Sequence, residues 1–468
     1  MSALSRARRA APDAVALVSP AQTLTWRELD DRVDRTAAAL LRRGVRRAGS
    51  ITAPVAIPGA PSLESVLALL ALVRLGIPAL PLHPRLSPLE RTRLVGSLRL
   101  QLVLEPNELG GAEAGPSGPP AAVDPAAPVA AVATSGSTRS PRVVALSRTA
   151  FDVTSSGVWR ALGAAPGDRW LLELPLAHVG GLSVVLRSIA RRVAIVLPPP
   201  GPVEPAWLES ARVTLVSWVP SQLARALEAA DTAPRGLRAV MLGGAGAPPA
   251  LLARATEVGW PVRTTYGLTE ATGTVTLESA APAERRGSGS PLPGVAVRLS
   301  SVGEIEVSGP TLALGTYRDV VEPLQLEGGW LSTGDLGALE GDTLVVRGRA
   351  SEMIITGGEN VHPAEVEAAL TADPAVRRAC VFAIPDPLWG ELVCAAIVAE
   401  GPTLDLAELD RRLAGSLASF RRPRRYALLA DLPETAVGKV DRRATQELAS
   451  PLLVRPALGA VPSRRKSV

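Results

Sequence analysis

Apolar positions at helical spacing alternate with short apolar runs along the first part of the chain. Residues 25–43 repeat apolar side chains with the period of a helix, and Gly44 follows as a stop signal. A short run at 51–57, a helical pattern over 62–75 and another short run at 77–82 come next. Strand and helix patterns that alternate in this way predict an α/β region with parallel strand pairing.

The same alternation returns in the middle of the chain, where apolar runs end in small or polar residues. Runs at 129–133, 171–176 and 239–242 lead into loops that contain Gly, Ser or His. A run at 213–219 precedes a helical pattern at 221–229. Because ligands bind at the carboxyl ends of strands in open α/β sheets, these loops predict a shared pocket.

The pattern changes twice in the second half of the chain. Short runs with Gly and Pro turns predict a β-rich subdomain at about 289–346. After Arg349, helical and strand patterns alternate in a stretch long enough for a small α+β domain. The predicted organisation is an N-terminal domain at 1–348, a hinge at 349–351, a mobile C-terminal cap domain at 352–450 and a frayed tail at 451–468.

The composition favours a well-packed globular protein without a nucleic-acid partner. Hydrophobic residues make up 47% of the 468 residues, and 50 basic residues only slightly outnumber 45 acidic ones. No basic block is interleaved with aromatic residues, as nucleic-acid binding would favour. No apolar stretch is long enough to span a bilayer, and the basic start lacks the apolar core of a secretory signal. We therefore expect a cytoplasmic protein without membrane insertion, with Cys380 and Cys394 as buried thiols.

An acidic residue in a tight glycine turn precedes an arginine by a short distance. Asp335 ends the segment STGD, and Arg349 ends the segment RGR. A carboxylate can accept both hydroxyls of a vicinal diol such as ribose, and a guanidinium adds a planar fork of donors. The stretch predicts one edge of a nucleotide site; an ordinary surface hairpin is the alternative.

A loop rich in Ser, Thr and Gly follows the apolar run at 129–133. Its backbone N–H groups and hydroxyls suit the phosphate chain of a nucleotide. The G-K-[ST] ending of the Walker pattern is absent, and a solvated turn is the alternative.

His178 and the heptad TTYGLTE mark two further strand ends. His178, one of three histidines, lies between a predicted strand and a Gly-Gly pair that opens a helix. A lone His is more often structural, but this position makes a ligand site a stronger alternative. The ring of Tyr266 can stack on a base, and the carboxylate of Glu270 can hold Mg²⁺. A core aromatic and an exposed carboxylate are the alternatives for these two residues.

Lys439 is the most informative single residue. The chain uses Arg at nearly every basic position, and Lys466 is its only other lysine. Lys439 lies on a Gly-centred turn, and an ammonium is a compact point charge that Arg replaces poorly. The turn favours a chemical role; a chance surface lysine is the alternative.

Together these segments resemble the adenylate-forming superfamily of acyl-CoA synthetases. The motifs run in order as TSGSTRSPR, PLAHVGG, GGAGAP, TYGLTE, STGDLG, GRASEMIITGGENVHPAEVE and PETAVGKVDR. The resemblance implies an α/β N-terminal domain with a β subdomain and a small mobile α+β cap. It also implies a reaction of a carboxylic acid with ATP and Mg²⁺, giving an acyl-adenylate that coenzyme A then converts to acyl-CoA.

The resemblance implies roles for the residues that match these motifs. Lys439 would bridge the carboxylate and the α-phosphate, Thr269 and Glu270 would serve the α-phosphate and Mg²⁺, and Asp335 and Arg349 would hold the ribose. Tyr266 would stack on adenine. The other implied ATP-binding residues are Thr134, Ser135, Gly136, Ser137, Thr138, Arg142, Gly244, Ala245 and Gly267.

An acyl pocket, a coenzyme A loop and a hinge follow from the same resemblance. Ser351 would be the hinge residue. The loop over coenzyme A would comprise Gly357, Gly358, Glu359 and Asn360. The acyl pocket would be lined by His178, Val179, Gly180, Gly181, Gly244, Ala245, Gly267, Leu268 and Thr272, with Arg187 as a candidate cation; a solvated helix residue is the alternative for Arg187.

Within the superfamily the chain looks most like the ligases that join 2-succinylbenzoate to coenzyme A in menaquinone biosynthesis. A ligase for another aryl or medium-chain acid is the alternative. Arg139 and Arg142 stand where relatives usually carry Gly and Lys, so a catalytically weak nucleotide-binding homologue is a second alternative. A homodimer remains open beside a monomer.

Overall fold

The computed structural model describes residues 2–46, 53–108, 124–134, 142–278, 287–318, 320–435 and 439–456. Its largest sheet has nine strands, and the strands from β12 to β1 pair in parallel. In spatial order the strands are β14 (Ser290–Pro291), β13 (Thr276–Leu277), β12 (Val262–Tyr266), β11 (Ala239–Leu242), β10 (Leu215–Trp218), β8 (Arg169–Leu171), β9 (Ala194–Val196), β1 (Val15–Val18) and β2 (Thr23–Thr25).

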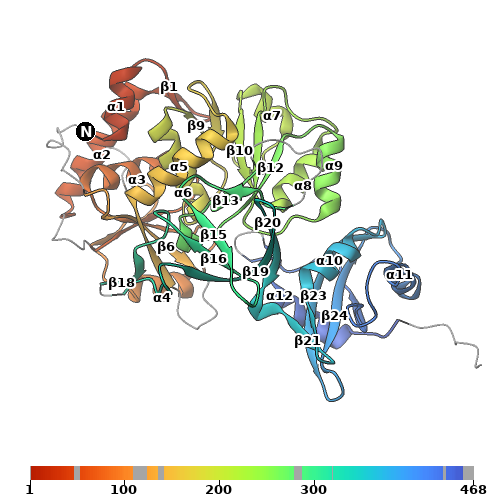
Figure 1. Cartoon of the computed structure of the whole chain (residues 1–468). Helices are drawn as coiled ribbons and strands as arrows, with labels where there is room; N and C mark the ends of the chain where they lie inside the picture. The colour runs from red at the N-terminus through yellow and green to blue at the C-terminus, as the bar shows by residue number, and fades with distance from the viewer. Residues whose placement is uncertain are drawn as a thin grey trace, which may run out of the picture.

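A second sheet of seven strands lies across the core from the first (Figure 1). The strands from β5 to β6 pair in parallel, and β7, β17 and β18 add antiparallel pairs. In spatial order they are β18 (Val321–Pro323), β17 (Gly315–Tyr317), β7 (Arg142–Ser147), β6 (Pro128–Thr134), β4 (Ala79–Leu82), β3 (Val55–Pro58) and β5 (Leu102–Val103).

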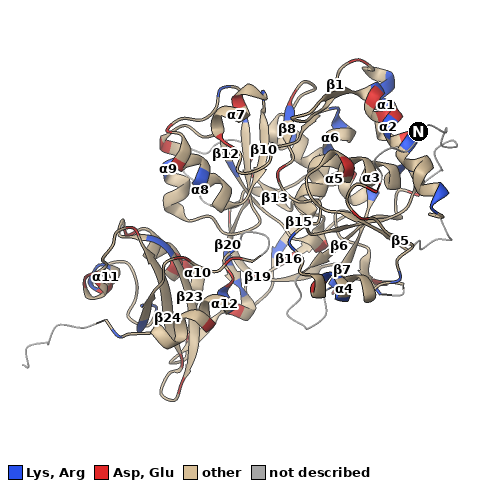
Figure 2. Cartoon of the chain, turned by 180° about the vertical axis from the view of Figure 1, so that it is seen from behind, with Lys and Arg blue, Asp and Glu red and all other residues tan. Residues whose placement is uncertain are grey.

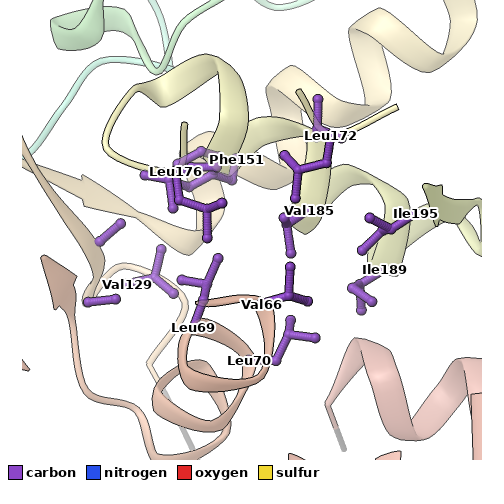
Figure 3. Packing of buried hydrophobic residues seen from close by; sticks show 14 of the residues in the cluster. Val66, Leu69, Leu70, Val129, Phe151, Leu172, Leu176, Val185, Ile189 and Ile195 are labelled. Atoms are coloured by element: carbon purple, nitrogen blue, oxygen red, sulfur yellow. The ribbon is translucent and has the colours of Figure 1, made fainter. Parts of the chain in front are cut away.

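Helices fill the space between the two sheets and cover their outer faces. One core cluster joins residues of both sheets with side chains of the inner helices, such as Leu69, Phe151 and Val185 (Figure 3). The inner helices are α1 (Ala3–Ala10), α2 (Trp26–Arg42), α3 (Leu63–Leu75), α5 (Arg148–Leu162) and α6 (Val179–Arg191). Separate clusters pack α4 (Pro88–Gly96) on the seven-stranded sheet, and α7 (Pro205–Ser210), α8 (Pro220–Ala229) and α9 (Pro249–Glu257) on the nine-stranded sheet.

A four-stranded antiparallel sheet connects this body to the C-terminal domain. Its strands are β15 (Ala296–Leu299), β16 (Glu304–Ser308), β19 (Leu331–Glu340) and β20 (Thr343–Arg349), and the short helix η2 (Ala350–Glu352) follows. The C-terminal elements are β21 (Ile354–Thr356), β22 (Glu359–Val361), α10 (Pro363–Thr371), β23 (Val376–Asp386), β24 (Gly390–Ala399), α11 (Leu406–Leu413), β25 (Arg425–Leu428), α12 (Arg442–Ala449) and η3 (Ser450–Leu452).

The predicted α/β architecture with a β subdomain and an α+β C-terminal domain is confirmed. The helix predicted at 62–75 is α3, where the Ser62 hydroxyl accepts from the Ser65 N–H and Gly76 ends the helix in the left-handed region. Cys380 and Cys394 are buried as predicted, and burial raises the pKa of each thiol to about 12. The exact domain boundaries stay predictions. No helix of the described residues is a candidate to span a membrane.

Two expectations about local structure are wrong. The strand predicted at 171–176 ends at Leu171, because the apolar side chains of Leu172 and Leu176 are buried in the core from a loop rather than from a strand. The tail does not fray directly after residue 450. Val454 exchanges two backbone hydrogen bonds with Tyr426, at 2.8 and 2.9 Å.

A buried ion pair ties α3 to α2. The guanidinium of Arg74 contacts the carboxylates of Asp30 and Asp34, and the side chains of Arg74 and Asp30 are only 4% and 5% exposed. We expect Arg74→Ala to lower the free energy of unfolding by about 3–5 kcal/mol, because it leaves the Asp30 carboxylate buried with only part of its compensation. Urea unfolding followed by circular dichroism measures this change.

The exposed pair between Arg27 and Asp13 provides the matched control. Arg27→Ala removes the same side chain at the surface of α2 and should cost less than about 1 kcal/mol. Equal effects of the two substitutions would contradict a stabilising role for the buried pair.

Candidate active site

A carboxylate at the junction with the C-terminal domain is contacted from two sides. The antiparallel register of β19 and β20 places Asp335 opposite Arg349. Arg349 Nε lies 2.8 Å from Asp335 Oδ1, and the Tyr266 hydroxyl donates to Asp335 Oδ2 at 2.7 Å. Burial raises the pKa of Asp335, while Tyr266, Arg349 and Lys439 oppose that rise. The predicted pair of Asp335 and Arg349 and the predicted residue Tyr266 therefore meet in one place.

Tyr266 ends β12 and is 8% exposed. Burial, followed by the charge of Asp335, raises the pKa of its phenol, so the hydroxyl remains a donor. The structure thus gives the hydroxyl a definite role in fixing Asp335. Stacking of the ring on adenine stays a prediction.

The turn after β12 leaves no room for a side chain at Gly267. A Cβ there would lie 1.5 Å from the carbonyl oxygen of Gly273. Thr272 in this turn has a φ of 55° and donates its hydroxyl to the Thr311 carbonyl at 2.7 Å. Thr272 is fully buried and its hydroxyl stabilises the turn, while its place in the acyl pocket stays a prediction. Leu268 packs partly buried against the core.

Thr269 and Glu270 open the short helix η1 (Thr269–Ala271), and both are half-buried. Among the described residues, no group of three or more His, Cys, Asp or Glu side chains could hold a metal ion. Mg²⁺ is usually bound by one or two carboxylates together with substrate phosphates and waters. The single carboxylate of Glu270 fits that mode, in which the nucleotide supplies further ligands.

Lys439 lies in a short turn of the C-terminal domain. The Thr435 N–H donates to the Lys439 carbonyl at 2.7 Å, and the Lys439 N–H donates to the Thr435 hydroxyl at 3.3 Å. Lys439 is exposed, yet the protein atoms crowded around it lower the pKa of its ammonium, as does Arg349, while Asp335 and Glu352 oppose this. In this arrangement of the domains (Figure 1), Lys439 is near enough to Asp335 for their charges to interact.

His178 is the residue before α6 and makes no capping hydrogen bond with its side chain. Its Nε2 is buried and has no partner among the described residues. Burial, then His83 and Lys439, lowers the pKa of His178 to about 4. The imidazole is therefore neutral near pH 7, and it is near enough to Lys439 for the Lys439 charge to affect it.

His83 is a site residue that the sequence analysis missed. Its ring centroid lies 5.1 Å from that of His178, and its Nδ1 accepts a hydrogen bond from the Arg85 N–H at 3.1 Å. Burial lowers the pKa of His83 as well. His83 directly follows β4, so the rule about strand ends that singled out His178 could have found it.

The Gly-Gly pair that opens α6 is required by packing. A Cβ at Gly181 would lie 2.3 Å from the carbonyl oxygen of Pro175, and one at Gly180 would lie 3.0 Å from Leu174. Gly273 lies in the turn after β12, and a Cβ built there would contact the side chain of Val179. The pair therefore lets α6 start close to the preceding loop, next to the turn after β12.

The loop after β11 is open to solvent. Gly244 has a φ of 79°, and both Gly244 and Ala245 are exposed. The loop is consequently accessible to a ligand at the end of the sheet, as the sequence predicts.

Arg187 lies on α6 and is only 2% exposed, so it is not a solvated helix residue. Its guanidinium lies 4.8 Å from the centroid of the Trp170 ring, and its Nη1 is 4.0 Å from Met241 Sδ. Its Nε is buried without a hydrogen-bond partner in the described part of the chain. Burial lowers the pKa of Arg187 to about 9. Buried charges in proteins are normally paired, so Arg187 remains a candidate to contact an anionic ligand.

The predicted phosphate loop connects two neighbouring strands. Thr134 ends β6 and pairs with Arg142, which begins β7, and Arg142 is exposed. The predicted residues Ser135, Gly136, Ser137 and Thr138, together with Arg139, lie outside the described residues. The structure thus places the two ends of the loop side by side.

The predicted coenzyme A loop is the turn of a β-hairpin in the C-terminal domain. Gly357 and Gly358 both have positive φ, at 59° and 85°, as a two-residue hairpin turn requires. Glu359 and Asn360 follow on β22 and are exposed, and Ser351 lies in η2. Trp389 was not predicted for this region, yet a Cβ at Gly357 would lie 2.8 Å from its ring.

Comparison with known proteins agrees with this geometry. Residues 4–317 match the model of the AMP-binding enzyme family, and residues 365–439 match the AMP-binding enzyme C-terminal domain. The 2-succinylbenzoate–CoA ligase of Bacillus velezensis is 33% identical, with 93% of this chain and 96% of that protein covered.

Two solved structures of o-succinylbenzoate coenzyme A synthetase from Bacillus subtilis are also similar, each at 28% identity. The complex with the acyl-adenylate intermediate has a TM-score of 0.84 and covers 94% of this chain and 97% of that one. The complex with ATP and a magnesium ion has a TM-score of 0.82, with 95% and 99% covered. From the matched family model and this near-complete coverage, the chain belongs to the AMP-binding enzyme family.

Proposed function

We propose that the chain is an ATP-dependent acid–CoA ligase that acts on 2-succinylbenzoate in menaquinone biosynthesis. In the first half-reaction the carboxylate attacks the α-phosphorus of ATP and diphosphate leaves. In the second, the thiol of coenzyme A attacks the acyl carbon and AMP leaves. The similarity to 2-succinylbenzoate–CoA ligases over nearly the whole chain supports this reaction, and Arg187 is the observation that supports the acid.

Arg187 favours an acid with two carboxylates. One carboxylate must reach the α-phosphate to react, and the second is then left inside the protein. An ionised carboxylate is costly to bury unless it meets an opposite charge. The buried guanidinium of Arg187 lacks a carboxylate partner among the described residues and offers that charge.

Lys439 supplies positive charge where the first half-reaction builds negative charge. Donors that are fixed before the reaction stabilise a developing charge without reorganisation. The Lys439 ammonium would bridge the attacking carboxylate and the α-phosphate, and Glu270 would hold Mg²⁺, which neutralises phosphate oxygens. Asp335 and Arg349 would hold the ribose, so that the nucleotide is oriented for attack.

Several finer points belong to the same proposal. We place the protein in the cytoplasm, with a carboxylic acid, ATP and coenzyme A as its binding partners and no nucleic acid among them. A homodimer remains an open alternative to a monomer.

A panel of carboxylic acids tests the substrate. We expect diphosphate release with ATP to depend on the acid added and to be fastest with 2-succinylbenzoate. Response only to another aryl or medium-chain acid would favour the alternative ligase. ATP binding without any acid-dependent release would favour a catalytically weak homologue.

Arg187→Met tests the reason for that preference. The substitution keeps an apolar side chain of similar length and removes the charge, so KM for 2-succinylbenzoate should rise about 30-fold or more, as 2 kcal/mol implies. KM for benzoate, which lacks the second carboxylate, should change little. A similar rise for both acids would contradict a charge-specific role.

Lys439→Ala should separate the two half-reactions. Acid-dependent diphosphate release should fall about 100- to 1,000-fold, the range found when one preorganised donor is removed. Formation of acyl-CoA from supplied acyl-adenylate should change much less, because the mobile cap implied by the resemblance would carry Lys439 away from the site before coenzyme A attacks. Lys466→Ala is the matched control and should retain both activities. Equal losses in both steps would argue against the assigned role.

Asp335→Ala should weaken ATP binding. The substitution removes the acceptor proposed for the ribose hydroxyls and leaves Arg349 and Tyr266 without their partner. We expect the Kd for ATP, measured by calorimetry, to rise about tenfold or more, since hydrogen bonds to charged groups contribute about 1.5–3 kcal/mol. Unchanged ATP affinity would exclude this role of Asp335.

A further inference from the structure

A buried hydroxyl on α6 has no partner inside the protein. Ser183 is 5% exposed, and its Oγ is buried without a hydrogen-bond partner among the residues that the structure describes. Proteins leave few buried polar groups in this state, and each one needs a reason, such as a ligand that completes the bond.

Buried hydroxyls on other helices of the chain have found a partner in the backbone. Thr154 of α5 donates to the carbonyl of Ala150 at 2.8 Å. Thr445 of α12 donates to the carbonyl of Asp441 at 2.7 Å. A bond to the carbonyl four residues earlier is the usual local solution for Ser or Thr inside a helix. Ser183 does not use it, so its hydroxyl is left as a donor for another molecule.

Arg187 lies one helical turn after Ser183. Residues four positions apart lie on the same face of a helix, so both side chains leave α6 on the same side. Side chains on a helix also lean toward its N-terminus, which extends the long side chain of Arg187 over the turn that carries Ser183. Nε of Arg187 is buried and without a partner in the described part of the chain, as Oγ of Ser183 is. One buried helix face therefore presents a hydroxyl and a guanidinium that both lack acceptors.

This face of α6 packs against the end of the nine-stranded sheet that carries the candidate active site. A Cβ built at Gly273, in the turn after β12, would lie 3.7 Å from Ser183 Oγ. That turn directly follows Tyr266. The guanidinium of Arg187 lies 4.8 Å from the centroid of the Trp170 ring on β8. Ser183 is thus on the part of α6 nearer to the site, and Arg187 lies one turn farther along the helix.

The surroundings of the two side chains are poor in charge. Figure 2 shows charged residues gathered on outer helices such as α1, α9 and α11, whereas β10 carries none. β10 pairs with β8 and β11, whose Trp170 and Met241 contact Arg187. In such surroundings an anion is stable only if its charge is compensated and its oxygens accept hydrogen bonds. A guanidinium and a hydroxyl together meet both needs.

We propose that Ser183 is a specificity-determining residue that contacts the substrate: its hydroxyl donates to the carboxylate that Arg187 attracts, so that the two side chains form one subsite for the second carboxylate of a dicarboxylic acid. The inference rests on the proposed function for the identity of the acid. Within the subsite, Arg187 supplies the opposite charge and Ser183 orients the carboxylate.

Ser183→Ala should affect stability and binding in different ways. Without ligands its Tm should equal or exceed that of the wild type, because the hydroxyl that is removed makes no bond in the folded protein. The Kd for 2-succinylbenzoate, measured by calorimetry with AMP in the nucleotide site, should rise about tenfold or more, because a hydrogen bond to a charged group is lost. A hydroxyl that served only the fold would give a lower Tm and an unchanged Kd, and that result would overturn the inference.

Ser188→Ala is the matched control. Ser188 lies on the same helix, is fully buried, and has an Oγ that also lacks a partner among the described residues. It directly follows Arg187, so it projects from α6 about 100° away from it, whereas Ser183 shares its face. The Kd of Ser188→Ala for 2-succinylbenzoate should match that of the wild type.

A double-mutant cycle tests whether Ser183 and Arg187 hold the same carboxylate. Residues that share one partner have effects that do not add. In the Arg187→Met background, Ser183→Ala should therefore raise the Kd for 2-succinylbenzoate much less than it does in the wild type. An equal rise in both backgrounds would contradict a shared subsite.

The outcomes separate this inference from the proposed function. A Kd that is the same in the wild type and in Ser183→Ala overturns the inference, even where the wild type releases diphosphate normally with 2-succinylbenzoate. A rise of similar size in Ser188→Ala would reveal a general effect on the packing of α6 and would overturn it as well. Weaker binding in Ser183→Ala alone, with a wild type that binds the acid but releases no diphosphate, would keep the subsite and overturn the proposed function. No binding of the acid by the wild type would overturn both.

Discussion

The ion pair between Asp335 and Arg349 is the constraint on which the candidate site depends. It lies across the β19–β20 ladder, so strand register alone brings the two side chains together. The hydroxyl of Tyr266 adds a bond from the end of the nine-stranded sheet. Because β20 continues directly into η2, the same pair lies next to the predicted hinge. The proposed nucleotide site and the predicted domain junction therefore share one buried carboxylate.

Positive charge in the proposed site comes from both domains. Arg187 is buried within the large domain, whereas Lys439 belongs to the C-terminal domain. His178 adds no further positive charge, because burial and neighbouring groups lower its pKa to about 4 and it is neutral near pH 7. A charged imidazole would compete with Lys439 for the anionic reactants. A neutral one leaves the developing charge on the phosphate to the ammonium and the metal.

The sequence predicted the fold well where local signals and burial agree. The start residue Ser62, the apolar run and the stop residue Gly76 all predict the same helix, and the structure confirms it as α3. The strand predicted through Leu172 and Leu176 was wrong, because a buried loop can have the same apolar composition as a strand. The meeting of Asp335, Arg349 and Tyr266 was predicted through the family motifs. His83 was missed, because its importance comes from a neighbour distant in sequence.

Arg187 shows why substrate preference is harder to predict than fold. From the sequence it is one basic residue on an amphipathic helix, and only the packing of α6 on Trp170 and Met241 shows that its charge is buried. In the proposed role, such a cation would select ligands in two ways. A second carboxylate would be attracted to it, and an acid with an apolar group at that position would seal the guanidinium away from water without a partner. For the acid with the apolar group, the cost of the unpaired guanidinium adds to the lost attraction of a carboxylate. The preference for an acid with two carboxylates can therefore exceed what either effect would give alone.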